Sequence, residues 1–126
     1  MEILTVNYAI DNLEILSNQP IYLKGILSFQ FEDISINHYP KIEYRNDGSS
    51  SIWIDVDYGI LRFNEPVLSK WHGKRIIIEG ILQPPDPCFG GVGHMSLWSA
   101  SIVATEIDLF SDLARGEALR DRFTER

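Results

Sequence analysis

Two stretches of the chain are rich in strand-forming residues, and each carries a glycine in its middle. They are Ile-Tyr-Leu-Lys-Gly-Ile-Leu at residues 21–27 and Ile-Ile-Ile-Glu-Gly-Ile-Leu at residues 76–82. Glycine is a weak strand residue, so its presence inside a strand indicates a bulge or a sharp bend. The strands of a small closed barrel need such bends because they must coil strongly to meet. The pattern therefore predicts a small barrel with Gly25 and Gly80 at bends or bulges.

The alternation of apolar and polar residues defines the expected strands. Apolar residues recur at every second position over residues 21–30, which predicts a first strand with Leu23 and Leu27 facing inward. Residues 51–58 alternate in the same way and place Trp53 on the outer face. The remaining expected strands span residues 60–63, 74–82 and 97–107.

Three short helical segments are expected beside the strands. Asp11 is a good N-cap, and the apolar spacing after it predicts a short N-terminal helix that ends before Pro20. A helical turn is expected over residues 65–71, because Pro66 suits the first turn of a helix. The pattern also predicts a C-terminal helix over residues 112–123.

Five strands with a helical turn between the third and fourth, and with long loops over residues 31–50 and 83–94, resemble the OB-fold. That fold is a five-stranded Greek-key barrel. The residues that carry the resemblance are Gly25 in the first strand, the Gly73-Lys74-Arg75 entry into the fourth, and Gly80 within it. We expect the barrel to close by pairing of the first strand with the fourth as well as with the second.

The resemblance implies a fold and a range of functions. We expect one all-β domain over residues 1–126, with a five-stranded OB-like barrel at residues 21–109 and a helical tail at residues 110–126. OB-folds bind oligonucleotides, oligosaccharides and proteins, usually through the face framed by the first-to-second and fourth-to-fifth loops. The fold alone does not choose among these ligands.

Length and composition fit one globular domain. The chain has 126 residues, of which 44% are hydrophobic and 23% charged. No apolar run approaches the roughly 20 residues that a membrane helix needs, so no membrane association is expected. The single cysteine, Cys88, excludes an internal disulfide and fits a reducing compartment. We expect a cytoplasmic protein.

The net charge of the chain indicates which kinds of partner it can bind. The formal net charge is −7. Proteins bind nucleic acid largely by neutralising phosphates with cations, so an acidic chain argues against a nucleic-acid partner. Complementary charge speeds encounter, which favours a protein partner that is basic. The same acidity is also explained by solubility alone.

Candidate chemistry is weak. Cys88 and His94 bracket a glycine-rich loop, but structural zinc sites usually show a tighter paired spacing. As a nucleophilic pair they lack an orienting acid apart from Asp86. Asp55 and Asp57 share one side of a strand and are explained equally well as solvated acids. We expect no metal, no cofactor and no enzymatic activity.

The two long loops are unusual in composition. They are rich in aromatic residues, with methionine and arginine, which are the residue types that carry interface hot spots. The candidate binding residues are Tyr39, Tyr44 and Arg45 in the first loop, and Phe89, His94, Met95 and Trp98 in and just after the second. The alternative is that these rings plug the open end of the barrel.

A second candidate surface lies on the strands. Trp53 supplies an outward aromatic and Arg62 a nearby cation, which together are the elements of single-strand recognition. Asp55 and Asp57 share the face of Trp53, however, where they would repel a phosphate backbone.

The sequence thus favours a non-catalytic module that binds a protein partner through its two long loops. An immunity protein that neutralises a basic toxin would have this character. Two alternatives remain: an OB-fold protein that binds an oligonucleotide or oligosaccharide across Trp53 and Arg62, and a small enzyme that uses the loop of Cys88 and His94.

Overall fold

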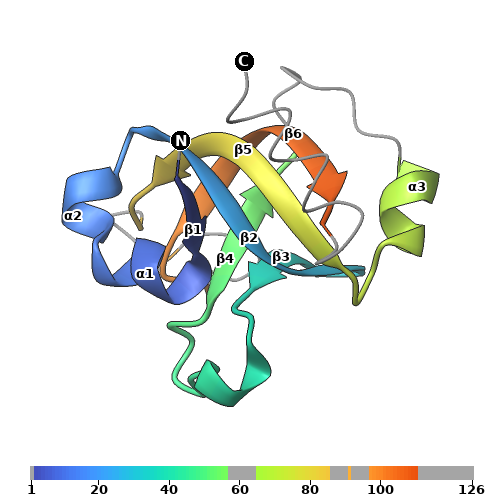
Figure 1. Ribbon diagram of the computed structural model, residues 1–126, viewed down its shortest axis with the longest axis horizontal. Coiled ribbons are helices and arrows are strands. Elements are labelled where there is room, and N and C mark those ends of the chain that lie inside the picture. Colours follow the sequence, from blue (N-terminus) through green and yellow to red (C-terminus); the bar gives the residue numbers. More distant parts are fainter. Residues whose placement is uncertain (1, 57–64, 86–90, 92–96, 111–126) are drawn as a thin grey trace.

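Six strands and a few short helices make up the described part of the molecule (Figure 1). The computed structural model describes residues 2–56, 65–85, 91 and 97–110. In chain order the elements are β1 (Ile3–Thr5), α1 (Val6–Asp11), α2 (Leu13–Leu16), β2 (Pro20–Gln30), β3 (Asp33–Asn37), the 3-10 turn η1 (Lys41–Glu43), β4 (Ser51–Asp55), α3 (Glu65–Lys70), β5 (Arg75–Gln83) and β6 (Ser101–Leu109).

All six strands belong to one sheet, in the order β1-β2-β3-β4-β6-β5, and β5 also pairs with β2. β4 and β6 run parallel, whereas β2–β3, β3–β4, β5–β6 and β2–β5 are antiparallel. Each of the strands β2 to β6 therefore pairs with two others of that set. The predicted pairing of the first expected strand, β2, with the fourth, β5, is confirmed.

The prediction of a loop over residues 31–50 is wrong for the first part of this segment, which contains β3. This strand forms a hairpin with β2, from Gln30 opposite Asp33 to Ile26 opposite Asn37. β3, and not the segment at residues 51–58, is thus the strand that follows β2. The turn between β2 and β3 contains none of the glycine or asparagine that usually marks a hairpin.

β1 lies beside the first half of β2, in parallel, with Ile3 opposite Tyr22. Residues 22–24 of β2 pair with β1 and β5 at once, so β1 and β3 share one edge of β2. Three residues are too few to show an alternation, which is why the sequence does not predict this strand.

The two strand glycines differ in their roles. The register between β5 and β6 shifts at Gly80, so the bulge predicted there is confirmed. β2 pairs with β5 in continuous register from Pro20 to Ile26, so this pairing has no bulge at Gly25. Gly25 instead lies where β3 comes close: a Cβ at this position would lie 2.5 Å from the carbonyl oxygen of Asn37.

The inward positions of the strands form the core, and α1 packs on it. Val6 and Ala9 of α1 are fully buried together with the strand residues. The fully buried strand side chains include Leu23, Leu27, Ile36, Ile52, Ile54, Ile76, Ile78, Leu82 and Ile102. Figure 1 shows α1 and α2 together on one side of the sheet and α3 on the opposite side.

The expected helices are partly correct. The helical turn after residue 64 is confirmed as α3. The N-cap prediction is wrong: Thr5 caps α1 by accepting from the backbone N–H of Tyr8, and Asp11 is the last residue of α1. The helical region therefore begins at Val6, nearly two turns earlier than expected, and the expected short helix that ends before Pro20 is α2. None of the helices in the described part is long and apolar enough to cross a membrane.

The limits of the other strands also shift. β4 begins at Ser51 as expected and ends at Asp55, and β6 begins at Ser101, four residues later than expected. The expected strand at residues 60–63 and the C-terminal helix at residues 112–123 lie outside the described residues.

Candidate functional site

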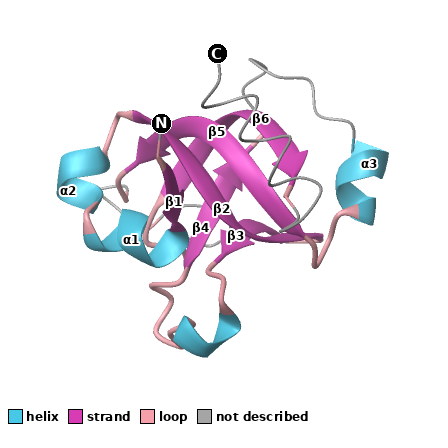
Figure 2. Ribbon diagram, in the orientation of Figure 1, coloured by secondary structure: helices cyan, strands magenta, loops and turns pink. Residues whose placement is uncertain are grey.

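The connection between β3 and β4, residues 38–50, extends away from the sheet and is called the β3–β4 loop below. Figure 2 shows its short helical turn, η1, as the part of the loop furthest from the strands. Ile42 lies in this turn and is 93% exposed, and Tyr44, just after it, is 40% exposed. The tip of the loop thus presents apolar and aromatic surface.

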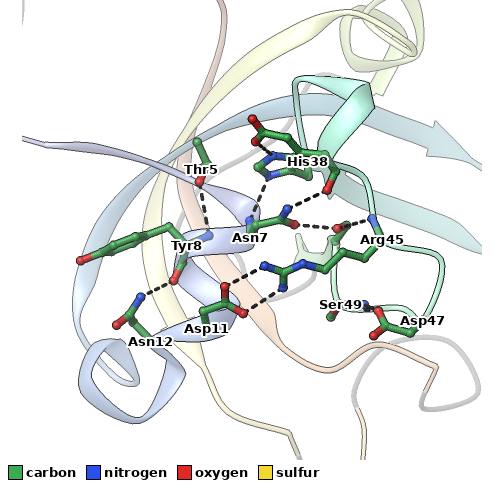
Figure 3. Close-up of polar contacts among 11 residues, drawn as sticks. Thr5, Asn7, Tyr8, Asp11, Asn12, His38, Arg45, Asp47 and Ser49 are labelled. Atoms are coloured by element: carbon green, nitrogen blue, oxygen red, sulfur yellow. Dashed lines mark hydrogen bonds and ion pairs between the residues drawn. The ribbon is translucent and has the colours of Figure 1, made fainter.

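Buried polar contacts fix the β3–β4 loop to α1, both at the last residue of η1 and at the base of the loop (Figure 3). The Asn7 side chain donates to the backbone carbonyl of Glu43 at 2.9 Å and accepts from the Ser50 hydroxyl at 2.6 Å. The Ser50 hydroxyl in turn accepts from the backbone N–H of Arg45 at 2.9 Å. Asn7 is 9% exposed and Ser50 is fully buried, so these hydrogen bonds are protected from water.

His38 completes this connection. Its ring is 2% exposed, and Nδ1 accepts from the backbone N–H of Asn7 at 3.1 Å. With Nδ1 used as an acceptor, the proton of the neutral ring lies on Nε2, which then donates to the Glu43 carboxylate at 2.9 Å. Both ring nitrogens are therefore occupied by the chain itself.

Arg45 forms an ion pair that links the β3–β4 loop to the end of α1. Its guanidinium donates to both carboxylate oxygens of Asp11, at 2.8 and 2.7 Å. The hydrogen bond from Arg45 holds the pKa of Asp11 below its ordinary value, and the same bond raises the pKa of Arg45. The predicted binding residue Arg45 thus positions the loop.

The two tyrosines predicted as binding residues lie in different surroundings. The Arg75 guanidinium lies over the Tyr39 ring, 4.1 Å from its centroid. The Tyr44 hydroxyl donates to the Asn37 side chain at 3.5 Å. Burial, with a smaller contribution from the negative charge of Asp33, raises the pKa of Tyr44.

Trp53 and Trp98 form a tilted pair, with ring centroids 4.9 Å apart. Their face of β4 is the outer one, because Ile52 and Ile54 on either side of Trp53 are fully buried in the core. The Trp98 indole N–H donates to the Ser51 hydroxyl at 2.9 Å, which fixes the ring on this face. Trp98 therefore packs on the outer face of β4 beside Trp53.

A row of polar side chains continues this outer face across β3 and β2. The Asp33 carboxylate accepts from the hydroxyls of Ser28, at 2.9 Å, and Ser35, at 2.6 Å. The Asn37 amide donates to the Ser35 hydroxyl at 3.2 Å. Sequence reasoning missed this row because it missed β3, although the alternation of Ser35 and Asn37 with isoleucines was a signal for it.

Four predicted binding residues, Arg62, Phe89, His94 and Met95, lie outside the described residues. Cys88 and Asp57 lie outside them too, so the proposed pairings of Cys88 with His94 and of Asp55 with Asp57 are not described. Within the described part of the chain, no group of three or more metal-binding side chains comes together.

The sequence matches no known protein-family model and no curated protein. The described fold is similar to that of a solved structure, OBody AM3L15 bound to hen egg-white lysozyme, with a TM-score of 0.55 and 12% sequence identity over 88% of this chain and 96% of that chain. The fold is OB-like.

Two related structures are less similar to this chain. OBody AM3L09 bound to hen egg-white lysozyme has a TM-score of 0.44 and 10% identity, over 77% of this chain and 86% of that one. OBody AM1L10 bound to hen egg-white lysozyme has a TM-score of 0.44 and 11% identity, over 78% and 84%. At such identities the likeness concerns the fold alone.

Proposed function

We propose that the protein is a non-catalytic module that binds a protein partner through the β3–β4 loop. The observation that carries this proposal is the contrast within the loop. Ile42 at its tip is 93% exposed, whereas its base is fixed by the buried side chains of Asn7, His38 and Ser50.

This contrast suits a binding loop for two reasons. A large apolar side chain at a tip gains free energy when a partner removes it from water. A loop that is already ordered loses little conformational entropy on binding, so more of that gain remains as affinity. Tyr44, partly exposed beside Ile42, supplies the aromatic type that interface hot spots favour.

The nature of the partner is proposed from charge. The chain carries a net charge of −7, which would attract and orient a basic protein. An immunity-type role, in which the chain neutralises a basic toxin in the cytoplasm, fits both the charge and the rigid loop. The OBody AM3L15 structure offers a precedent for the scaffold, since that OB-like chain is bound to a protein.

We further propose that strands β2 to β6 form a five-stranded barrel, which their circuit of pairings supports.

The test is a pull-down from the native host with the wild-type chain and two variants. Ile42→Glu places a charge at the loop tip and should abolish recovery of the partner, or weaken its binding by about tenfold or more. Ile15→Glu is the matched control, because Ile15 lies in α2 and is 75% exposed, away from the loop. Partner recovery that is equal for both variants would contradict the proposal.

A second candidate function rests on the outer face of the sheet. On the same face as the Trp53–Trp98 pair lie the carboxylate of Asp33 and the amide of Asn37, which are half-buried, and the buried hydroxyl of Ser35. Rings beside polar groups suit a sugar, and the acidic chain favours a neutral oligosaccharide over an oligonucleotide. Titration of neutral oligosaccharides against tryptophan fluorescence tests this alternative, and Trp53→Ala should remove any binding.

A further inference from the structure

A pocket of about 550 Å³ lies between the hairpin of β2 and β3, the β3–β4 loop and the turn that follows α3. Its volume falls in the range of small-molecule sites, about 300–1,000 Å³. Ile26 and Ser28 line it from β2, Tyr44 from the β3–β4 loop, and His72 and Gly73 from the turn. The pocket adjoins the loop tip: Lys41 and Tyr44 line it, whereas Ile42 does not.

Several polar groups at this pocket can donate hydrogen bonds. Lys41 brings an ammonium group and Asn46 an amide. His72 accepts a hydrogen bond from the backbone N–H of Phe29 through Nδ1, at 3.0 Å, so its neutral ring carries the proton on Nε2. No side chain of the described part that lines the pocket is acidic.

Two carboxylates, those of Asp33 and Glu43, lie next to the pocket without lining it. Asp33 accepts from the hydroxyls of Ser28 and Ser35, and Glu43 contacts Nε2 of His38. Among the described residues that line the pocket, Lys41 carries a full positive charge and none is acidic, while the negative charge of Asp33 is close enough to act on Tyr44 in the pocket wall.

Both walls of the pocket are fixed before any ligand arrives. The turn after α3 is tied to β2 by the backbone bonds from Gly73 N to Leu27 O, at 2.7 Å, and from Leu27 N to Lys74 O, at 3.0 Å. The opposite wall is the β3–β4 loop, which Asn7 ties to α1. A preformed pocket spends little free energy on ordering when a ligand binds.

We propose that this pocket binds a small anionic molecule through a carboxylate or phosphate group. The Lys41 ammonium and the Nε2–H of His72 would donate to the anionic oxygens, and Ile26 would contact the apolar part of the ligand. This proposal goes beyond the protein-binding function, and it is tested on the isolated chain without any partner.

The experiment titrates the labelled chain with inorganic phosphate, with citrate and with glucose, at an ionic strength held constant with sodium chloride. We expect at least one anion to bind saturably, with a dissociation constant of about 1 mM or lower. Amide NMR shifts should change mainly at residues 26–28, 37–46 and 72–73. Binding of phosphate alone would identify a phosphoryl ligand, and binding of citrate alone a carboxylate ligand.

Two charge-matched variants decide whether the pocket is responsible. Lys41→Gln should weaken anion binding about fivefold or more. Lys70→Gln removes the same charge from α3 at a residue that does not line the pocket, and should leave binding within about twofold. Saturable binding by neither anion, equal binding of glucose, or equal losses in the two variants would overturn the proposal.

Discussion

At Gly25 and Gly80, a strand comes too near its neighbour for a side chain. A Cβ on Gly25 would lie 2.5 Å from the carbonyl oxygen of Asn37, and a Cβ on Gly80 would meet the carbonyl oxygen of Val103. The atoms in the way belong to the backbone, so they cannot move aside without disturbing the pairing of two strands. These glycines are therefore needed for close approach, at Gly80 together with a bulge.

We expect Gly25→Ala and Gly80→Ala each to lower the free energy of unfolding by about 3 kcal/mol, as overpacking does in other cores. Gly48→Ala is the control. Gly48 has a φ of +88°, and a Cβ added there would meet no atom within 4 Å, so only backbone strain of about 1–2 kcal/mol applies. Urea denaturation measures all three variants. Equal losses at Gly25 and Gly48 would show that the close approach of β3 does not constrain Gly25.

At the scale of elements, the important contact is the one between α1 and the β3–β4 loop. These segments lie more than thirty residues apart in the chain, yet Asn7 and Asp11 of α1 contact Glu43, Ser50 and Arg45 of the loop. The polar side of α1 thus holds the loop, while its apolar side, with Val6 and Ala9, is buried in the core. One short helix joins the fold to the proposed binding loop.

The ion pair in this contact makes a pH-dependent contribution. The hydrogen bond from Arg45 lowers the pKa of Asp11 from its ordinary value of 3.8 in the folded state. The pair therefore stabilises the fold above pH 3.8, and this stabilisation is lost as the pH falls through the lower, folded-state pKa. Both side chains are partly exposed, so the contribution is small.

A double-mutant cycle of Asp11→Asn and Arg45→Met measures this contribution from urea unfolding at several pH values. We expect a small favourable coupling free energy at pH 7 that disappears in acid below the folded-state pKa of Asp11. A coupling that stays constant down to pH 2 would contradict the ion pair as its source.

The sequence predicts the elements with a regular alternation, because their inward side chains are set by the core. The expected limits of β2 and β5 agree with the structure within one residue at each end, and Pro66 correctly indicates α3. The sequence does not predict β3, because its hairpin turn, Phe31-Glu32, lacks a turn signal: Glu32 adopts a φ of +64°, a conformation that glutamate rarely takes. Local residue types do not reveal such a turn.

The site is less predictable than the fold. The composition of the β3–β4 loop indicates Tyr44 but not Ile42, because a single isoleucine among charged residues shows no periodicity. The role of Arg45 depends on Asp11, 34 residues away, and the sequence spacing gives no sign of that pairing. Contacts that form only when distant segments meet determine both roles.

At the scale of the whole molecule, two features have opposite effects on nucleic-acid binding: the tryptophan pair on the outer face favours it, and the negative net charge opposes it. The Trp53–Trp98 pair offers aromatic surface of the kind on which bases stack. Asp33 and Asp55 lie on the same outer side of β3 and β4, and the whole chain carries a net charge of −7. Phosphates approaching the tryptophans would therefore meet a repulsive potential.

We expect weak or no binding of single-stranded DNA or RNA at physiological salt. Stacking on Trp53 would contribute about 1–3 kcal/mol per base, which by itself corresponds to a dissociation constant weaker than millimolar. Trp98 already covers part of the Trp53 ring, so less than the full stacking energy is accessible. Titration of fluorescently labelled oligonucleotides measures the affinity, and Trp53→Ala tests whether any binding uses this face. The prediction would be overturned by submicromolar binding that Trp53→Ala abolishes and that falls steeply with added salt. Such binding would require a basic groove that outweighs the acids around the tryptophan pair.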